Sequence, residues 1–188
     1  MKRVLVPAIL LLVLFIAPAF GQDGCILYSD GTPPREVAEV AVPEGFACPD
    51  GETAAGETPE YYLLPTDAGS DVRFLYYTTG RGDPRRLAEA ALTSYSMLYD
   101  EFTAGEIQDG DFNGRSCLRF DYTCAYPNRA GDALVYEQTA VAYIPLDSDE
   151  FIACIVSLAF DDAKGYLSAE AMQERLASAM DAIELSGQ

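Results

Sequence analysis

Histidine is absent from the 188 residues of this sequence, and its absence excludes several classes of enzyme. Without an imidazole, the chain cannot activate a serine or cysteine nucleophile as Ser-His-Asp and Cys-His hydrolases do. Zinc sites with histidine ligands are excluded too, including the H-E-x-x-H sites of metalloproteases. An enzyme built from this chain would depend on carboxylate, tyrosine, cysteine or lysine chemistry.

Basic residues are scarce, because 12 Lys and Arg stand against 30 Asp and Glu, and the formal net charge is −18. Such a chain is repelled by nucleic acid and by anionic membrane surfaces, so we expect neither as a partner. Its ligands would be cationic, neutral or metal-bound, although a high net charge also serves solubility alone. The sequence indicates no cofactor.

The N-terminal residues have the three-part pattern of a secretory signal peptide. Two basic residues precede an apolar run over residues 4–16, and the small residues Ala19 and Gly21 follow it. We therefore expect residues 1–21 to be removed and the protein to be secreted or extracytoplasmic, with no remaining membrane segment. An uncleaved anchor is the alternative. Cys25 lacks the preceding aliphatic residue that lipidation requires, so we expect no lipid.

Residues 22–188 have a length typical of a single domain. Four β-rich segments with short connections predict an antiparallel meander, because a parallel return needs a dozen or more residues. These segments cover residues 107–112, 116–126, 134–144 and 151–160, and weaker strands are expected over 36–42, 61–64 and 72–78. Helices are expected over 84–102 and 168–183. The predicted fold class is α+β, with a single antiparallel sheet flanked by two main helices.

Each helix has a capping residue and one apolar stripe at helical spacing. Asp83 and Ser168 stand at the expected N-caps, and Pro84 suits the first helical position. We assign both stripes to the core rather than to a cofactor site. They consist of Leu87, Ala91, Tyr95, Leu98 and Phe102 in the first helix, and of Met172, Leu176, Ala179, Met180 and Ile183 in the second.

Side chains of the meander alternate between two faces, and the centres of the turns decide which residues pair. With turns centred near Ala130 and Ser148, even-numbered positions share an apolar face, on which Ala140 lies opposite the bulky Phe120. The odd face is polar. It carries a candidate binding patch made of Arg119, Asp121, Thr123, Glu137, Thr139 and Ser157. An ordinary solvated sheet face is the alternative.

Two short motifs suggest function but also have a structural explanation. The segment from Asp109 to Gly114 starts like an EF-hand calcium loop, yet Phe120 stands where the bidentate Glu is required. Its Asn113-Gly114 is a strong hairpin signal, so we expect no metal site. Arg81-Gly82-Asp83 matches an adhesion tripeptide, although Asp83 is also the expected helix cap.

Five cysteines leave at least one without a partner. Cys117 and Cys124 lie ~23 Å apart on one strand, and Cys154 is at least ~9.5 Å away, so these three cannot bond to one another. We predict a Cys25–Cys48 disulfide, with Cys124 and Cys154 buried as thiols. A bond from Cys25 or Cys48 to Cys117 or Cys124 is the alternative.

The order of elements resembles the PsbP/Mog-like α+β group. An early strand ends in Val42-Pro43-Glu44-Gly45-Phe46, and the C-terminal helix ends in Met180-Asp181-Ala182-Ile183-Glu184-Leu185-Ser186. Phe46 stands where many members have Trp. The resemblance covers most of residues 36–186. It implies helices on both sides of one antiparallel sheet and a binding or accessory role, and it carries over no functional residue.

We therefore expect a secreted, non-catalytic binding or accessory module for an unknown protein or small molecule. One alternative is a small hydrolase on the polar face, which requires two carboxylates ~5–10 Å apart in a pocket, or a strongly raised carboxylate pKa. The other is an adhesin acting through Arg81-Gly82-Asp83. An exposed, mobile loop tip would favour the adhesin, and a helix cap at Asp83 would count against it.

Overall fold

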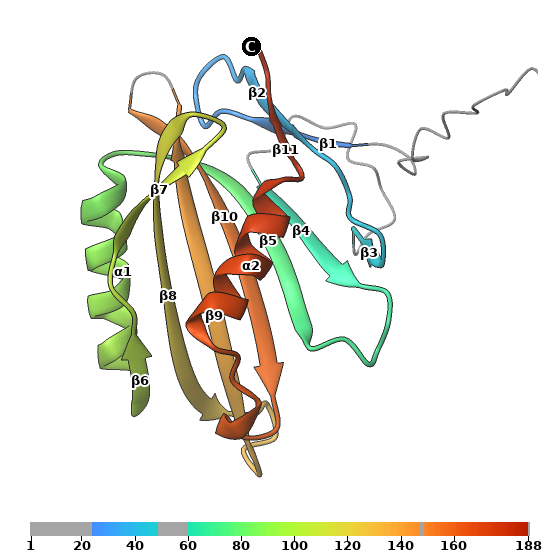
Figure 1. Cartoon of the computed structure of the whole chain (residues 1–188), viewed down its shortest axis with the longest axis vertical. Helices are drawn as coiled ribbons and strands as arrows, with labels where there is room; N and C mark the ends of the chain where they lie inside the picture. Colours follow the sequence, from blue (N-terminus) through green and yellow to red (C-terminus); the bar gives the residue numbers. More distant parts are fainter. Residues whose placement is uncertain (1–23, 49–59, 147–148, 188) are drawn as a thin grey trace, which may run out of the picture.

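The computed structural model describes residues 24–48, 60–146 and 149–187, whose strands form two antiparallel sheets (Figure 1). The larger sheet has eight strands, in the order β3-β4-β5-β10-β9-β8-β6 with β7 also paired to β8. These strands are β3 Phe46–Ala47, β4 Glu60–Pro65, β5 Val72–Arg81, β6 Glu101–Ala104, β7 Gln108–Phe112, β8 Arg115–Pro127, β9 Leu134–Pro145 and β10 Glu150–Phe160. The expected signal peptide, residues 1–21, lies outside the described residues. Within the described part, no helix has the length and apolar character needed to cross a membrane.

The predicted meander is confirmed, because β8, β9 and β10 are consecutive antiparallel neighbours. β7 and β8 form a hairpin around Asn113 and Gly114, whose φ angles are 52° and 80°. Asparagine and glycine tolerate such left-handed angles best, and two-residue hairpin turns require them. The Gly114 amide also donates to the Asp111 carboxylate at 3.2 Å. Residues of the calcium-like motif therefore serve a hairpin.

A second sheet of three strands corrects the expectation of a single sheet. It consists of β1 (Cys25–Tyr28), β2 (Glu36–Val40) and β11 (Ile183–Leu185), in the order β1-β2-β11. The C-terminal helix, α2 (Ala169–Met180), ends before Ile183, which pairs with Val40 instead of continuing the helix. This sheet pairs β2 with β11, which are far apart in the sequence, and a local sequence pattern does not predict such a pairing.

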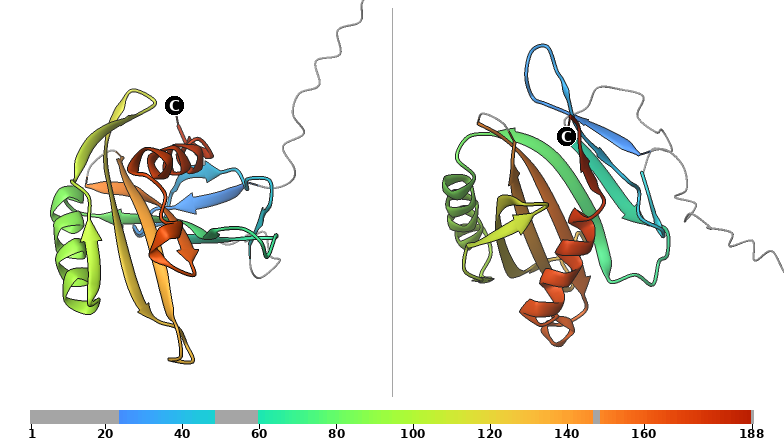
Figure 2. Two further views of the ribbon diagram at one scale, coloured as in Figure 1. Left: turned by 60° about the horizontal axis from the view of Figure 1, so that its bottom comes forward. Right: turned by 45° about the horizontal axis from the view of Figure 1, so that its top comes forward.

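The two helices pack on different faces of the large sheet (Figure 2). α2 and the small sheet cover one face, here called the α2 side, and α1 (Pro84–Leu98) packs on the other, the α1 side. Buried Tyr77 of β5 donates a hydrogen bond to the Ala179 carbonyl at 3.0 Å, which anchors the end of α2. All five residues of the predicted stripe are buried, Met172, Leu176, Ala179 and Met180 on α2 and Ile183 on β11.

α1 begins as predicted but buries a different stripe. The Asp83 carboxylate accepts hydrogen bonds from the first amides of the helix, as expected of its cap. Fully buried Ala88 belongs to one core cluster with residues of β8 and β9, and Leu92 and Tyr95 pack against this cluster. Leu87 and Leu98, which were predicted to be buried, are 38% and 72% exposed. The prediction is right for Tyr95 and wrong for Leu87 and Leu98, because the helix turns the small Ala88 toward the sheet. Phe102 also packs against this core, but from β6 (Glu101–Ala104), since α1 ends at Leu98.

The register between β8 and β9 differs by one residue from the predicted one. Residues 128–133 separate the paired Pro127 and Leu134, so the turn has an even number of residues and no central one. As a result, Tyr122 pairs with Thr139. Because side chains alternate with a period of two, a shift of one residue transfers one strand's whole set to the opposite face.

Both predicted faces are consequently divided between the two sides of the sheet. Ala140 lies opposite Asp121 rather than Phe120, so the expected packing of small against large residues is wrong. Even positions of β8 share the α1 side with odd positions of β9 and β10. The predicted polar patch is split into Arg119, Asp121 and Thr123 on the α2 side, and Glu137, Thr139 and Ser157 on the α1 side.

All five cysteines are free thiols in the structure, so the predicted disulfide is not formed. Its two sulfur atoms are nevertheless neighbours, with Cys25 Sγ and Cys48 Sγ 3.6 Å apart. Cys124 and Cys154 are buried as predicted. They lie on opposite sides of the sheet, however, and Cys154 shares the α2-side core with Cys117. The shifted register accounts for this difference.

The unequal burial of the two helices leads to a paired stability prediction. Leu176→Ala on α2 removes a fully buried side chain and should lower the free energy of unfolding by about 2–5 kcal/mol. Leu98→Ala at the exposed end of α1 should change it by less than about 0.5 kcal/mol. Urea unfolding of both variants measures the difference. Equal losses would contradict this arrangement of α1.

The neighbouring sulfurs lead to a prediction about oxidation. Burial and the adjacent Cys48 raise the pKa of Cys25 to about 12, so little thiolate is present at neutral pH and bonding should be slow. Oxidised glutathione at pH 8 to 9 should join Cys25 to Cys48 and leave three thiols. The bond should stabilise the fold by roughly 3 kcal/mol, as expected for a loop of this length. Non-reducing peptide mapping identifies the pair, and a bond between any other two cysteines would contradict the fold.

Candidate functional site: an aromatic strip on the α1 side

α1 covers only part of the α1 side, and the face of β4 that belongs to this side is exposed. Tyr62 and Leu64 of β4 are 40% and 38% exposed, whereas their neighbours Tyr61 and Leu63 are buried on the α2 side. The core beneath α1 is formed mainly by residues of β8 and β9. Large apolar side chains on an uncovered face of a sheet are a candidate interaction surface.

A run of aromatic rings and one arginine extends across this face, and we call it the aromatic strip. The ring centroids of Tyr62 and Phe74 are 4.8 Å apart, and those of Tyr62 and Tyr76 are 5.2 Å apart. The Arg73 guanidinium continues the run, because its central carbon lies 5.8 Å from the ring centroids of both Phe74 and Tyr126. Tyr126 in turn contacts Tyr99, with centroids 5.7 Å apart. The strip thus consists of Tyr76, Tyr62, Phe74, Arg73, Tyr126 and Tyr99.

Glu137 holds the middle of the strip in place from below. Its carboxylate forms an ion pair with Arg73 and accepts a hydrogen bond from the Tyr126 hydroxyl at 2.6 Å. Its other oxygen accepts a hydrogen bond from Thr139 at 3.1 Å. The Glu137 side chain is only 11% exposed, while that of Arg73 is 46% exposed. A buried carboxylate therefore neutralises and orients an accessible guanidinium.

Thr139 and Ser157 lie in one row of the sheet with Tyr122 and Phe74. A turn centred near Ala130 would instead place Asp121 opposite Thr139, so the observed register puts Tyr122 in the position expected for Asp121. The Ser157 hydroxyl is fully buried and makes no hydrogen bond to any residue in the described ranges. Three of the six predicted site residues, Glu137, Thr139 and Ser157, therefore lie close together, beneath the strip rather than on an open surface. That any of the six binds a ligand remains a prediction.

The phenols of Tyr62, Tyr76 and Tyr126 and the nearby Cys124 thiol are held in their neutral, protonated forms. Burial raises the pKa of Tyr62, and burial together with a hydrogen bond to Glu60 raises that of Tyr76. Burial and the Glu137 carboxylate raise the pKa of Tyr126, and burial raises that of Cys124 to about 11. These phenols and this thiol are poor nucleophiles near neutral pH. The strip can offer ring faces and hydroxyl donors rather than an activated nucleophile.

The other three predicted residues lie on the α2 side, where they have different surroundings. Arg119 donates to the Asp111 carbonyl at 2.7 Å and so fastens β7 to β8. Asp121 lies against Gly105, and burial raises the pKa of its carboxyl group, which is a feature of the hydrolase alternative. The second carboxylate of the predicted patch, Glu137, is on the opposite side of the sheet. The predicted patch therefore cannot supply a catalytic pair of carboxylates.

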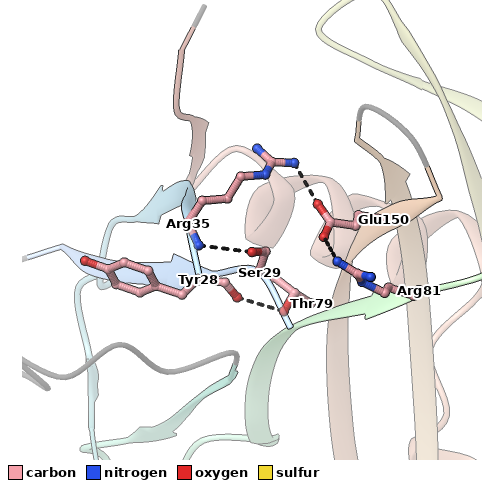
Figure 3. A network of polar contacts seen from close by, with 6 residues as sticks. All are labelled: Tyr28, Ser29, Arg35, Thr79, Arg81 and Glu150. Atoms are coloured by element: carbon pink, nitrogen blue, oxygen red, sulfur yellow. Dashed lines mark hydrogen bonds and ion pairs between the residues drawn. The ribbon is translucent and has the colours of Figure 1, made fainter. Parts of the chain in front are cut away.

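A second cluster of charges, shown in Figure 3, joins the two sheets. The Glu150 carboxylate at the start of β10 forms ion pairs with Arg35 and Arg81, whose Nη2 atoms each lie 2.7 Å from a carboxylate oxygen. Thr79 of β5 donates to the Tyr28 carbonyl of β1 at 2.9 Å. The side chain of Glu150 is 7% exposed, whereas both arginine side chains are about half-exposed. These contacts explain the cluster as a structural clasp, so we do not assign a ligand to it.

The adhesion tripeptide is part of this clasp and of the helix start. Arg81 is bound to Glu150, and the Asp83 carboxylate accepts a hydrogen bond from the Arg85 amide at 3.0 Å. Gly82, with a φ angle of 113°, makes the bend between them, and its amide donates to the Asp149 carbonyl. Both charged residues thus have intramolecular roles. The helix cap at Asp83 is the observation that counts against the adhesin alternative.

No group of three or more Cys, Asp or Glu side chains within the described ranges is placed to hold a metal ion. The acidic residues of the β7–β8 hairpin have other partners. Asp109 pairs with Arg85 at 2.7 Å, and Asp111 binds the hairpin turn.

No protein-family profile and no curated protein sequence matches this chain. Among solved structures, a mutant of protein Mog1 is similar, with a TM-score of 0.48, 11% identity, and coverage of 87% of this chain and 96% of that one. LpqN, described as involved in cell envelope biogenesis of Mycobacterium tuberculosis, has a TM-score of 0.43 and 14% identity. The match covers 79% of this chain and 82% of LpqN. These similarities agree with the predicted PsbP/Mog-like fold and concern the fold alone.

The sequence predicts neither the strip nor the Glu150 clasp. It places Tyr62 and Tyr76 on strands, but their position on an uncovered face depends on where α1 packs. A weak signal was present, because β4 and β5 together carry five aromatic residues on their two faces. Arg73 and Glu137 are far apart in sequence and meet only through the order of the strands.

The Glu150 clasp leads to a prediction about pH. Burial favours a raised pKa for Glu150, but hydrogen bonds and charges from Arg81 and Arg35 outweigh it, so the pKa lies below its ordinary value. The clasp therefore contributes stability above the unfolded-state pKa near 4.3, and this contribution is lost as the pH falls through the lowered folded-state value.

Glu150→Gln should accordingly lower the free energy of unfolding by about 1–2 kcal/mol at pH 7, a modest amount because both arginines are half-exposed. The difference from the wild type should shrink below pH 4. Urea titrations at pH 3.5, 5 and 7 measure it. A difference that stays constant with pH would contradict an ionised Glu150 in the clasp.

Proposed function

We propose that this protein is a non-catalytic binding module that docks a protein partner on the aromatic strip. The observation that carries the proposal is the continuous run from Tyr99 to Tyr76, which begins beside the core beneath α1 and ends at β4, where α1 leaves Tyr62 exposed. Tyrosine, phenylalanine and arginine are the residues enriched in the cores of protein interfaces. They provide contact area at low cost in conformational entropy, because each ring has only two rotatable side-chain bonds.

The rigidity of the strip also supports a docking role. Its rings come from β4, β5 and β8 and from the C-cap of α1, and the carboxylate of Glu137 on β9 fixes Arg73 and Tyr126 from beneath. A surface that is already ordered loses little entropy when a partner binds.

The neutral state of the phenols, and the separation of Asp121 from Glu137, weigh against the hydrolase alternative. The sequence pattern of residues 1–21 supports a location outside the cytoplasm.

A selection experiment tests this function. A display library of 12-residue peptides is selected on the wild type, and every enriched peptide is then titrated against Tyr62→Ala and Leu134→Ala. Tyr62 and Leu134 have similar exposure, 40% and 43%, so the second variant is a matched control outside the strip. We expect affinity to fall about tenfold in Tyr62→Ala, the effect of losing one interface anchor, and to persist in Leu134→Ala.

The unfolding midpoint of each variant shows that the fold is retained. If the wild type enriches no peptide, or if every enriched peptide binds Tyr62→Ala as tightly as the wild type, the strip is not the docking surface.

A further inference from the structure

The end of the strip at β4 and β5 has the chemistry of a site for positive charge. Tyr62 and Tyr76 are directly opposite each other on the two strands. The Tyr76 hydroxyl donates a hydrogen bond to the carboxylate of Glu60, an exposed residue at the start of β4. Two ring faces and a carboxylate therefore lie together. Ring faces are the negative side of the aromatic quadrupole and attract Lys and Arg.

The middle of the strip already holds a cation in this way. The Arg73 guanidinium lies over Phe74 and Tyr126 and is neutralised by Glu137. Over Tyr62 and Tyr76, by contrast, no cation from the described residues is found. Rings beside a carboxylate thus occur twice along the strip, and at the second place the Tyr62 side chain is 40% exposed.

The charge of the whole chain favours the same kind of partner. With a formal net charge of −18, the protein attracts cationic segments over long distances and repels acidic ones. Such steering raises association rates, and complementary charges suppress wrong partners. Glu60 and Glu137 also outnumber Arg73 along the strip, so the local charge has the sign of the global one.

We propose that the partner presents a Lys- or Arg-bearing segment, whose cationic side chains stack on Tyr62 and Tyr76 and pair with Glu60. This inference rests on the proposed function and specifies the chemistry of the partner. The apolar stems of the same side chains would lie along Leu64 and Tyr62, the exposed apolar residues of β4. Arginine is the better fit, because its planar guanidinium stacks on rings and still donates to a carboxylate.

The test removes the positive charge of the peptide's arginine side chains without changing their shape. Enriched library peptides that depend on Tyr62 should contain Lys or Arg, and replacing each Arg by citrulline, its neutral isostere, should weaken binding at least about tenfold. Calorimetric titration at 0.05 M and 0.5 M salt should show weaker binding at high salt for the Arg peptide and little change for the citrulline peptide.

Variants of the protein localise the charge effect. Glu60→Gln should weaken binding of the Arg peptide by about three- to tenfold and that of the citrulline peptide hardly at all. Glu174→Gln is the matched control, because it makes the same charge change at an exposed position of α2, on the other side of the sheet. It should alter both affinities by less than about twofold.

The outcomes separate this inference from the proposed function. Tyr62-dependent peptides that bind equally well with Arg or citrulline, or that are enriched in acidic or proline residues, would leave docking intact and overturn the cationic partner. Equal effects of Glu60→Gln and Glu174→Gln would reduce the charge effect to the net charge of the protein and would also overturn the site. Loss of all Tyr62 dependence would overturn the docking function itself.

Discussion

The pairing of β8 with β9 is the constraint on which the rest of this structure depends. Pro127 pairs with Leu134, and the even number of residues between them places Tyr122 opposite Thr139. That register directs Glu137, Thr139 and Ser157 to the α1 side, and Arg119 and Asp121 to the α2 side. It also directs Ala140 and Ala142 to the α2 side, where both are fully buried in the same core as α2. A shift of one residue would exchange a polar and an apolar surface on one of these strands.

The two sides of the sheet differ in how they exclude water. The α2 side has an aliphatic core closed by α2 and the small sheet, and the clasp at Glu150 fastens that small sheet to β5 and β10. The α1 side is closed by a single helix, which reaches β8 and β9 but not β4. Aromatic residues occupy the uncovered part. Because tyrosine has a polar tip and an apolar body, it is suited to a surface that is dry in one state and wet in another.

Buried carboxylates have a supporting role at two places in this protein. Glu137 orients Arg73 within the strip, and Glu150 joins Arg35 to Arg81. Each is buried, and each is neutralised by arginines whose side chains remain partly exposed. A buried carboxylate without such partners would cost free energy, because its charge would be neither solvated nor neutralised. The same ion pairs hold the arginine side chains in position. For Arg73 this fixation builds the middle of the aromatic strip, and for Arg81 it accounts for a residue of the adhesion-like tripeptide.

The sequence by itself determined the elements that depend on neighbouring residues. These elements are the helix starts at Asp83 and Ser168, the hairpin at Asn113-Gly114, and the meander of strands with short connections. Caps, turns and short loops depend only on residues that are close in the sequence. The spacing of Met172, Leu176 and Met180 likewise identified the buried face of α2. The tertiary structure alone decided the β8–β9 register, the small sheet made from both ends of the chain, and the face that α1 turns to the sheet. It therefore also decided the strip, because Tyr62, Arg73, Tyr126 and Glu137 come together through strand order and through the limited length of one helix. Contacts of that kind depend on how separate elements fill space, and no local pattern encodes them.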